Sequence, residues 1–94
     1  MTRDIDQIII GVRRRFPNVA VDQLKVSHPG DDDGLWFFAL PGIRKDIQIE
    51  SPSGMCPFIV EHDDMKSSSE ALQASSIEEV IDAVSSYLQT LATQ

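Results

Sequence analysis

The chain contains a single cysteine, Cys56, and cysteine is a residue type that can act as a nucleophile near neutral pH. A catalytic thiol needs a lowered pKa, which a nearby cation, a histidine or a helix N-terminus supplies. Cys56 instead lies between Met55 and Pro57 at the start of an apolar stretch. Because free cysteines are among the most buried residue types, we expect Cys56 to serve as a small apolar side chain.

The alternative is a pocket in which Cys56 works together with a histidine. The residues that would complete such a site are His28, His62 and Glu50, and only the fold can bring them to the thiol. A functional site would place a histidine within hydrogen-bond reach of Cys56 or of a carboxylate, inside a cleft. This alternative predicts a small-ligand binder or a minor enzyme.

Two acidic clusters offer oxygen ligands for hard cations such as Ca²⁺ or Mg²⁺. The first is Asp31-Asp32-Asp33, which lacks the alternating register and the distant glutamate of a calcium-binding loop. The second is residues 61–64, Glu-His-Asp-Asp, with one histidine where catalytic zinc sites usually supply three protein ligands. Both clusters are typical of solvated acidic loops, so we expect no metal site.

The sequence contains no motif typical of a serine nucleophile or of a phosphate-binding loop. Ser51 and Ser53 lie in a Pro- and Gly-containing turn without the G-x-S-x-G pattern of a nucleophile elbow. The glycine-rich patterns that cradle phosphates are absent from the sequence as well. We therefore expect no catalytic residue and no cofactor.

The charge of the chain is acidic and unevenly distributed. The 94 residues carry a formal charge of −7, but residues 1–25 hold five basic and three acidic side chains. Residues 26–94 hold three basic and twelve acidic ones. The run Arg13-Arg14-Arg15 suits the negative end of a helix dipole. Because nucleic-acid binding needs a basic face, the acidic balance argues against that function.

An apolar run of strand length, residues 35–40, carries three of the six aromatic side chains. Strand alternation sends Trp36, Phe38 and Leu40 to one face and Leu35, Phe37 and Ala39 to the other. Two helices can cover only one face of a small sheet, so the other face would expose large apolar groups, which often mark partner surfaces. The alternative is that the sheet curls or a loop folds over it, so that both faces are buried. The candidate partner surface expected from this reasoning is Trp36, Phe38, Leu40, Ile43 and Met55.

Helical periodicity is clear at both ends of the chain. Residues 4–16 place one apolar stripe on a helix that Thr2 or Asp4 can cap and that ends before Pro17. Gly11 either weakens this helix or marks a close approach to a neighbouring element. The second helix begins after Ser76, which forms a capping box with Glu79, and its stripe is Ile77, Val80, Ile81, Val84, Leu88 and Leu91.

Short strands fill the middle of the chain. Residues 46–50 alternate between isoleucine and polar side chains, which is typical of a half-buried strand, and residues 35–40 and 57–61 are two further strands. Residues 19–26 form a strand with a bulge near Asp22, or only their second half does. Residues 27–34 are a turn-rich loop, and residues 62–75 are a polar, mobile loop.

These elements predict one α+β domain over residues 1–94. We expect a two-layer sandwich in the order α-β-β-β-β-α, with an antiparallel meander of three or four strands. The N- and C-terminal helices would pack on one face of the sheet. A chain of this length buries only about 60–65% of its unfolded surface, so few residues remain to build a catalytic pocket.

Part of the sequence resembles strings found in short uncharacterised bacterial proteins. The shared core reads W-F…P-G…I-E-S…G-x-C-P-F-I-V-E and extends over residues 35–61. The resemblance implies a bacterial source and a central antiparallel sheet. It implies no activity and no catalytic residue.

Together these observations favour a small acidic, non-enzymatic protein-binding domain. Its partner would be another protein of basic character, in which case the domain is an inhibitor or immunity-type protein, or a second copy in a homodimer formed through the sheet. An acidic surface would steer the chain towards a basic partner. The sequence shows neither a signal peptide nor an apolar stretch long enough for a membrane span, so we expect a cytoplasmic protein without membrane or nucleic-acid partners.

Overall fold

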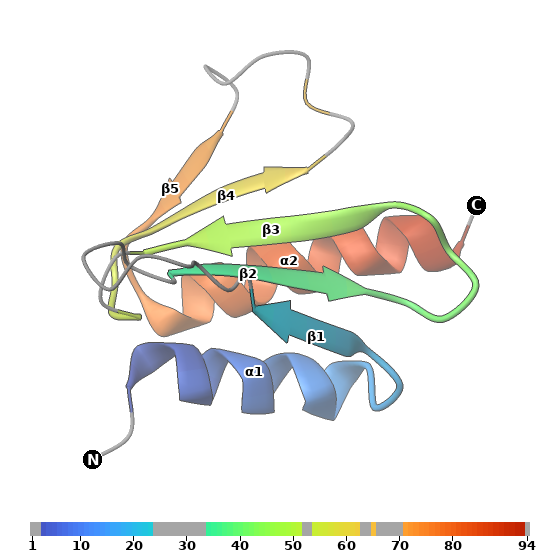
Figure 1. The fold of residues 1–94 in the computed structure, drawn as a ribbon, viewed down its shortest axis with the longest axis horizontal. Coiled ribbons are helices and arrows are strands. Elements are labelled where there is room, and N and C mark those ends of the chain that lie inside the picture. Colours follow the sequence, from blue (N-terminus) through green and yellow to red (C-terminus); the bar gives the residue numbers. More distant parts are fainter. Residues whose placement is uncertain (1–2, 24–33, 52–53, 63–64, 66–70, 94) are drawn as a thin grey trace.

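The structure is a computed structural model that describes residues 3–23, 34–51, 54–62, 65 and 71–93. Five strands form one antiparallel sheet in sequence order, and a helix stands at each end of the chain (Figure 1). The elements are α1 (Asp4–Arg15), β1 (Ala20–Gln23), β2 (Leu35–Ala39), β3 (Asp46–Glu50), β4 (Phe58–His62), β5 (Leu72–Ala74) and α2 (Ile77–Ala92).

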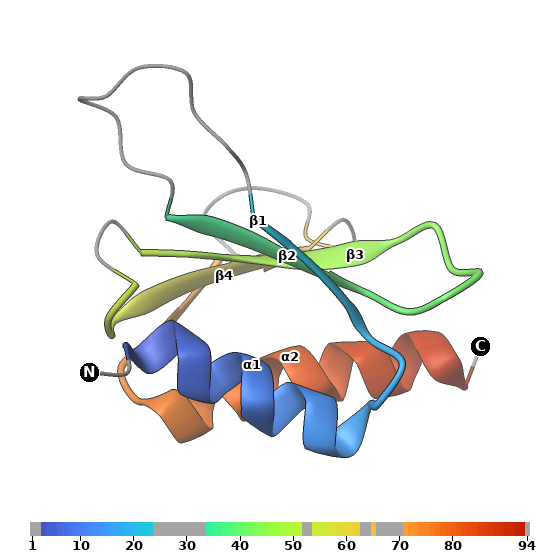
Figure 2. The same cartoon turned by 60° about the horizontal axis from the view of Figure 1, so that its bottom comes forward.

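Both helices lie on the same side of the sheet and pack against each other (Figure 2). This arrangement confirms the two-layer α+β sandwich and the meander expected from the sequence. The sheet has five strands instead of three or four, because residues 72–74 of the expected polar loop pair with β4. That segment, Leu72-Gln73-Ala74, is too short to show a strand pattern of its own, so its pairing is decided by the adjacent strand.

The core lies between the sheet and the helices. Helix α1 contributes Ile5, Ile8 and Val12 to the core. Helix α2 contributes the members of its predicted stripe that are buried, which are Val80, Val84, Leu88 and Leu91. From the sheet come Trp36, Phe38, Ile47, Ile49, Phe58, Val60 and Ala74, each at most 3% exposed. One face of every strand therefore supplies the core, as alternation requires.

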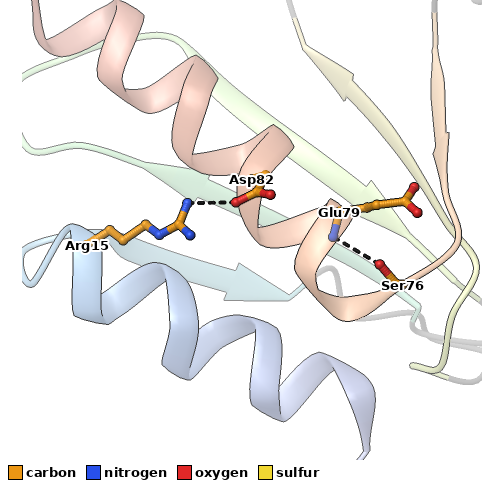
Figure 3. A network of polar contacts seen from close by, with 4 residues as sticks. All are labelled: Arg15, Ser76, Glu79 and Asp82. Carbon is orange, nitrogen blue, oxygen red and sulfur yellow. Dashed lines mark hydrogen bonds and ion pairs between the residues drawn. The ribbon is translucent and has the colours of Figure 1, made fainter.

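The ends of the helices follow from local hydrogen bonds. Arg3 precedes α1, and its backbone N–H donates to Asp6 Oδ2 at 3.1 Å, so neither Thr2 nor Asp4 is the residue at the cap position. Ser76 caps α2 as predicted, since its Oγ accepts from the Glu79 N–H at 3.2 Å (Figure 3). The Glu79 carboxylate accepts in turn from the Ser75 N–H at 3.3 Å.

Gly11 marks a close approach of the two helices. A Cβ at this position would overlap Ile81 Cδ1 and would lie 3.0 Å from Ile81 Cγ1. The glycine thus lets α1 and α2 meet at the point where a larger side chain would push them apart. Of the two interpretations of Gly11 offered by the sequence, the close approach is the one seen in the fold.

Strand β1 is described over the first half of the strand expected at residues 19–26. It comprises Ala20–Gln23 and pairs with β2, so that Val21 lies opposite Phe38 and Asp22 opposite Phe37. Residues 24–26 of the expected strand and most of the expected loop at 27–34 lie outside the described residues. Within the described strands, the pairing from Ala20 to Gln23 is continuous.

Candidate partner-binding surface

The sheet has two chemically different faces, and strand register assigns each residue to one of them. Trp36 lies opposite Ile49, and Phe38 lies opposite Ile47. These four side chains point towards the helices and are buried. The neighbouring positions of each strand must point to the opposite face.

This assignment corrects the expected partner surface. Trp36 is 3% exposed and Phe38 is 0% exposed, so both belong to the core beneath the helices. Leu40 and Ile43 are partly buried and pack against the same core. Only Met55, at 41% exposure, is open to solvent. The sequence showed the correct alternation but did not show which of the two parities the helices would cover.

The opposite face is not covered by any described helix or strand, and we call it the open face (Figure 2). Its centre is apolar: Phe37 and Leu35 are partly exposed on β2, and Ile59 on β4 is 43% exposed. Register places Glu50 between Leu35 and Ile59, one strand from each. Because neighbouring strands are about 4.8 Å apart, these side chains belong to one patch, in which Glu50 separates Ile59 from Leu35.

Carboxylates surround and interrupt this apolar centre. Asp22 lies opposite Phe37 on one side, and Gln48 and Glu61 continue the same row on the other. Gln48 Nε2 donates to Glu61 Oε2 at 3.4 Å, which holds two polar side chains of the row together. Among the described strand residues the open face carries four acidic side chains and no basic one. Its members are Ala20, Asp22, Leu35, Phe37, Ala39, Asp46, Gln48, Glu50, Ile59, Glu61 and Gln73.

Cys56 lies elsewhere, where the start of α1 meets the connection between β3 and β4. The Ile5 N–H donates to the Gly54 carbonyl oxygen at 2.9 Å, and the Cys56 N–H donates to Asp4 Oδ2 at 2.9 Å. Gly54 has a φ of +73°, a conformation that glycine adopts without strain. The residues around Cys56 thus anchor α1 to the sheet.

The environment of Cys56 disfavours a thiolate. Burial raises the pKa of the Cys56 thiol to about 11, and a hydrogen bond to Asp4 with the negative charges of Asp4 and Glu79 acts in the same direction. Cys56 is partly buried and packs against the core. A nucleophile needs the reverse shift, because the thiolate is the reactive form.

The two described members of the alternative site, His62 and Glu50, occupy other positions in the sheet than Cys56. Cys56 precedes β4, whereas His62 is the last residue of that strand and stacks on Tyr87 with ring centroids 3.9 Å apart. Glu50 is exposed on the open face. His28 and the cluster Asp31-Asp32-Asp33 lie outside the described residues. Within the described ranges, no three His, Cys, Asp or Glu side chains are grouped as metal ligands.

A hollow lies beside His62. It has a volume of about 320 Å³ and is lined mainly by apolar side chains of β3, β4 and α2. Its polar contributors are hydroxyl groups of α2 and the imidazole of His62. No carboxylate lines this hollow among the described residues.

The three arginines of α1 lie on the helical layer. Arg15 Nη1 forms an ion pair with Asp82 Oδ1 of α2 at 3.0 Å (Figure 3). Both side chains are more than half exposed, so this pair adds little stability. Arg13 and Arg14 are exposed as well. All three stand in the last turn, where the sequence placed them to complement the helix dipole.

Comparison of the chain with protein-family models, curated proteins and solved structures finds no match. The geometry of the open face therefore carries the functional argument. Among the described residues, no helix is both long and apolar enough to cross a bilayer.

Proposed function

We propose that this chain is a non-enzymatic binding domain whose open face receives a protein with a basic rim and an apolar centre. The observation that carries the proposal is the composition of that face: Phe37, Leu35 and Ile59 lie among carboxylates, without a basic side chain in the described strands. Partner surfaces combine an apolar centre with a polar border in this way. A cytoplasmic location belongs to the same proposal.

Charge selects the kind of partner. The carboxylates of Asp22, Glu50 and Glu61 make the open face negative, which accelerates encounter with a positive surface and repels a negative one. In a dimer formed by two open faces, the carboxylates of one copy would face those of the other and repel them. The symmetric sheet-to-sheet homodimer is therefore disfavoured, and a basic protein is the better partner.

The size of the open face suggests a transient complex. Five-residue strands span about 16 Å, and five strands about 4.8 Å apart span about 19 Å, giving a projected area of about 300 Å². Interfaces of this extent lie at the small end of the known range and belong to reversible encounters. In its inhibitor form, the proposal is that the acidic face occludes the nucleic-acid-binding surface of a basic toxin or nuclease.

The test is a quantitative affinity capture from the native host with matched variants. The variants Glu50→Lys and Ile59→Lys each place a cation on the open face at an exposed position. Their controls are Glu78→Lys on α2 and Leu72→Lys on β5, which make the same changes elsewhere at similar exposure. We expect a stoichiometric basic protein to be retained by the controls and lost by both open-face variants.

The purified partner then provides the second readout. Its association rate should fall as salt is raised, because steering by exposed charges is screened at high ionic strength. A partner that all four variants retain would show that the open face is not the binding surface. Loss of binding by Leu72→Lys alone would instead point to the β5 edge.

A further inference from the structure

The outer face of α1 has the opposite character to the open face. The helix buries Ile5, Ile8 and Val12, so the stripe on its far side comprises Arg3, Gln7, Ile10 and Arg14. All four residues of the stripe are exposed, and Ile10 is 51% exposed, the highest value among the exposed large hydrophobic side chains. We call this stripe the basic helix face, and Arg13 stands beside it.

The basic helix face and the open face lie on opposite layers of the molecule. The helices cover one side of the sheet (Figure 2). Strand register places the carboxylates on the other side, and helical periodicity places the stripe of α1 away from the core. Helix α1 has 12 residues and is about 18 Å long, which matches the strands of about 16 Å. Each surface combines an exposed apolar side chain with charged neighbours, which are acidic on the open face and basic on the stripe itself. Glu78 of α2 borders that stripe, because it lines the same hollow as Ile10 and Arg14.

We propose that the partner recognised by the open face includes a second copy of this chain, bound head to tail. Helix α1 of one copy lies on the open face of the next, so that Ile10 contacts Ile59 and Phe37 while Arg14 faces Glu50. This inference rests on the proposed function, because it uses the same face and names a basic surface that fits it.

The charges also decide the geometry of the assembly. Sheet-to-sheet contact opposes carboxylates, and contact between two basic helix faces opposes arginines, so both symmetric arrangements are disfavoured. A contact between two different patches leaves one patch free on each end of the pair. Such heterologous contacts add further copies and produce open chains or rings, in contrast to a closed dimer.

Sedimentation of the purified protein tests this arrangement. From micromolar to millimolar concentration at low salt, the average mass should rise beyond that of a dimer, and high salt should reverse the rise. The open-face variant Glu50→Gln/Ile59→Thr and the helix-face variant Ile10→Gln/Arg14→Gln should each raise the concentration for self-association by about tenfold or more. The substituted positions are all exposed, so circular dichroism should show unchanged folds.

Mixing the two variants provides the decisive measurement. The open-face variant retains its basic helix face, and the helix-face variant retains its open face, so one productive contact remains between them. We expect a one-to-one complex that does not grow further. The control variant Leu72→Thr/Arg44→Gln changes similar exposed residues outside both patches and should assemble as the unmodified chain does.

A monomer throughout the concentration range at low salt would overturn the inference, as would a mixture that forms no complex. A closed dimer insensitive to both variants would show pairing through a sheet edge. If the chain stays monomeric while open-face variants still lose a captured basic protein, the inference fails and the proposed function stands. If self-association depends on both faces while the open-face variants still capture the basic protein, the head-to-tail inference stands. The proposal that the open face binds a foreign protein then fails.

Discussion

The thiol of Cys56 should react slowly in the folded protein, and the structure gives the size of the effect. Burial, followed by the hydrogen bond and charge of Asp4, raises its pKa from 9.0 to about 11. At pH 7 the thiolate fraction therefore falls about 100-fold, to about one molecule in 10,000. A more basic thiolate is also a better nucleophile, which recovers about sixfold to tenfold in disulfide exchange.

The net expectation is labelling by an aromatic disulfide about tenfold slower than in the unfolded chain at pH 7, before any further slowing from partial burial. The assay measures the release of the aromatic thiolate under native conditions and in urea, from pH 6 to the alkaline limit of the fold. The native rate should keep rising with pH well beyond the point at which the unfolded rate levels off.

Asp4→Asn provides the discriminating variant. Removing the negative charge should lower the pKa of Cys56 part of the way towards 9.0 and accelerate labelling, since Asp4 disfavours the thiolate. An aspartate that supported a catalytic cysteine would show the opposite effect. Rapid native labelling with an inflection below pH 9, slowed by Asp4→Asn, would refute the reasoning and restore the enzyme interpretation.

The raised pKa of Cys56 also has a consequence for stability. The folded state holds the thiol proton more tightly than the unfolded state does. Stability is therefore fully present below about pH 9 and is lost as the pH rises through about 11. Because the thiol is partly exposed, the loss is at most about 2 kcal/mol. Urea unfolding of the unmodified chain and of Cys56→Ala over this pH range should show the difference, and equal slopes would contradict it.

Three further substitutions test the packing in urea unfolding experiments. Gly11→Ala gains about 1 kcal/mol of helix propensity, but the new methyl group overlaps Ile81, so alone the substitution should be neutral to destabilising by about 1–2 kcal/mol. In an Ile81→Val background, which removes Cδ1, Gly11→Ala should become stabilising. Additive effects of the two substitutions would refute the contact. Phe38→Ala should cost about 3–5 kcal/mol and Phe37→Ala much less, because only Phe38 is fully buried. Ser76→Ala should cost about 1 kcal/mol by removing the N-cap of α2, a result that equal stability would contradict.

The sequence predicted the secondary structure best where one physical signal dominated. Helix α2 combines an N-cap, a capping box and an uninterrupted stripe, and it begins after Ser76 as expected. Strand β3 alternates strictly and occupies residues 46–50 as expected. Strand β5 was missed because its three residues carry little pattern of their own, and their pairing with β4 is a tertiary effect.

The candidate site was predicted less well, for a reason that applies to any continuous apolar strand. Residues 35–39 offer large side chains to both faces, so periodicity alone cannot tell which set the helices cover. Ile49 of β3 lies opposite Trp36, and Val60 of β4 lies opposite Ile49, so these apolar residues share one face. Their polar neighbours Gln48 and Glu61 lie opposite each other on the other face. The alternation of β3 and β4 therefore shows which face is buried. Pairing β2 with β3 would have placed Phe37 opposite Gln48, and so on the open face.

The net charge of −7 does not describe each surface of the molecule, because the open face and the outer stripe of α1 carry different charges. The strands place acidic side chains such as Glu50 on the open face, whereas α1 places Arg3 and Arg14 on its outer stripe. A basic partner and a second copy would therefore compete for the same carboxylates. Weakening the basic helix face with Ile10→Gln/Arg14→Gln should then free the open face and strengthen capture of the foreign protein. Unchanged capture under conditions of self-association would mean that the two partners do not share a surface.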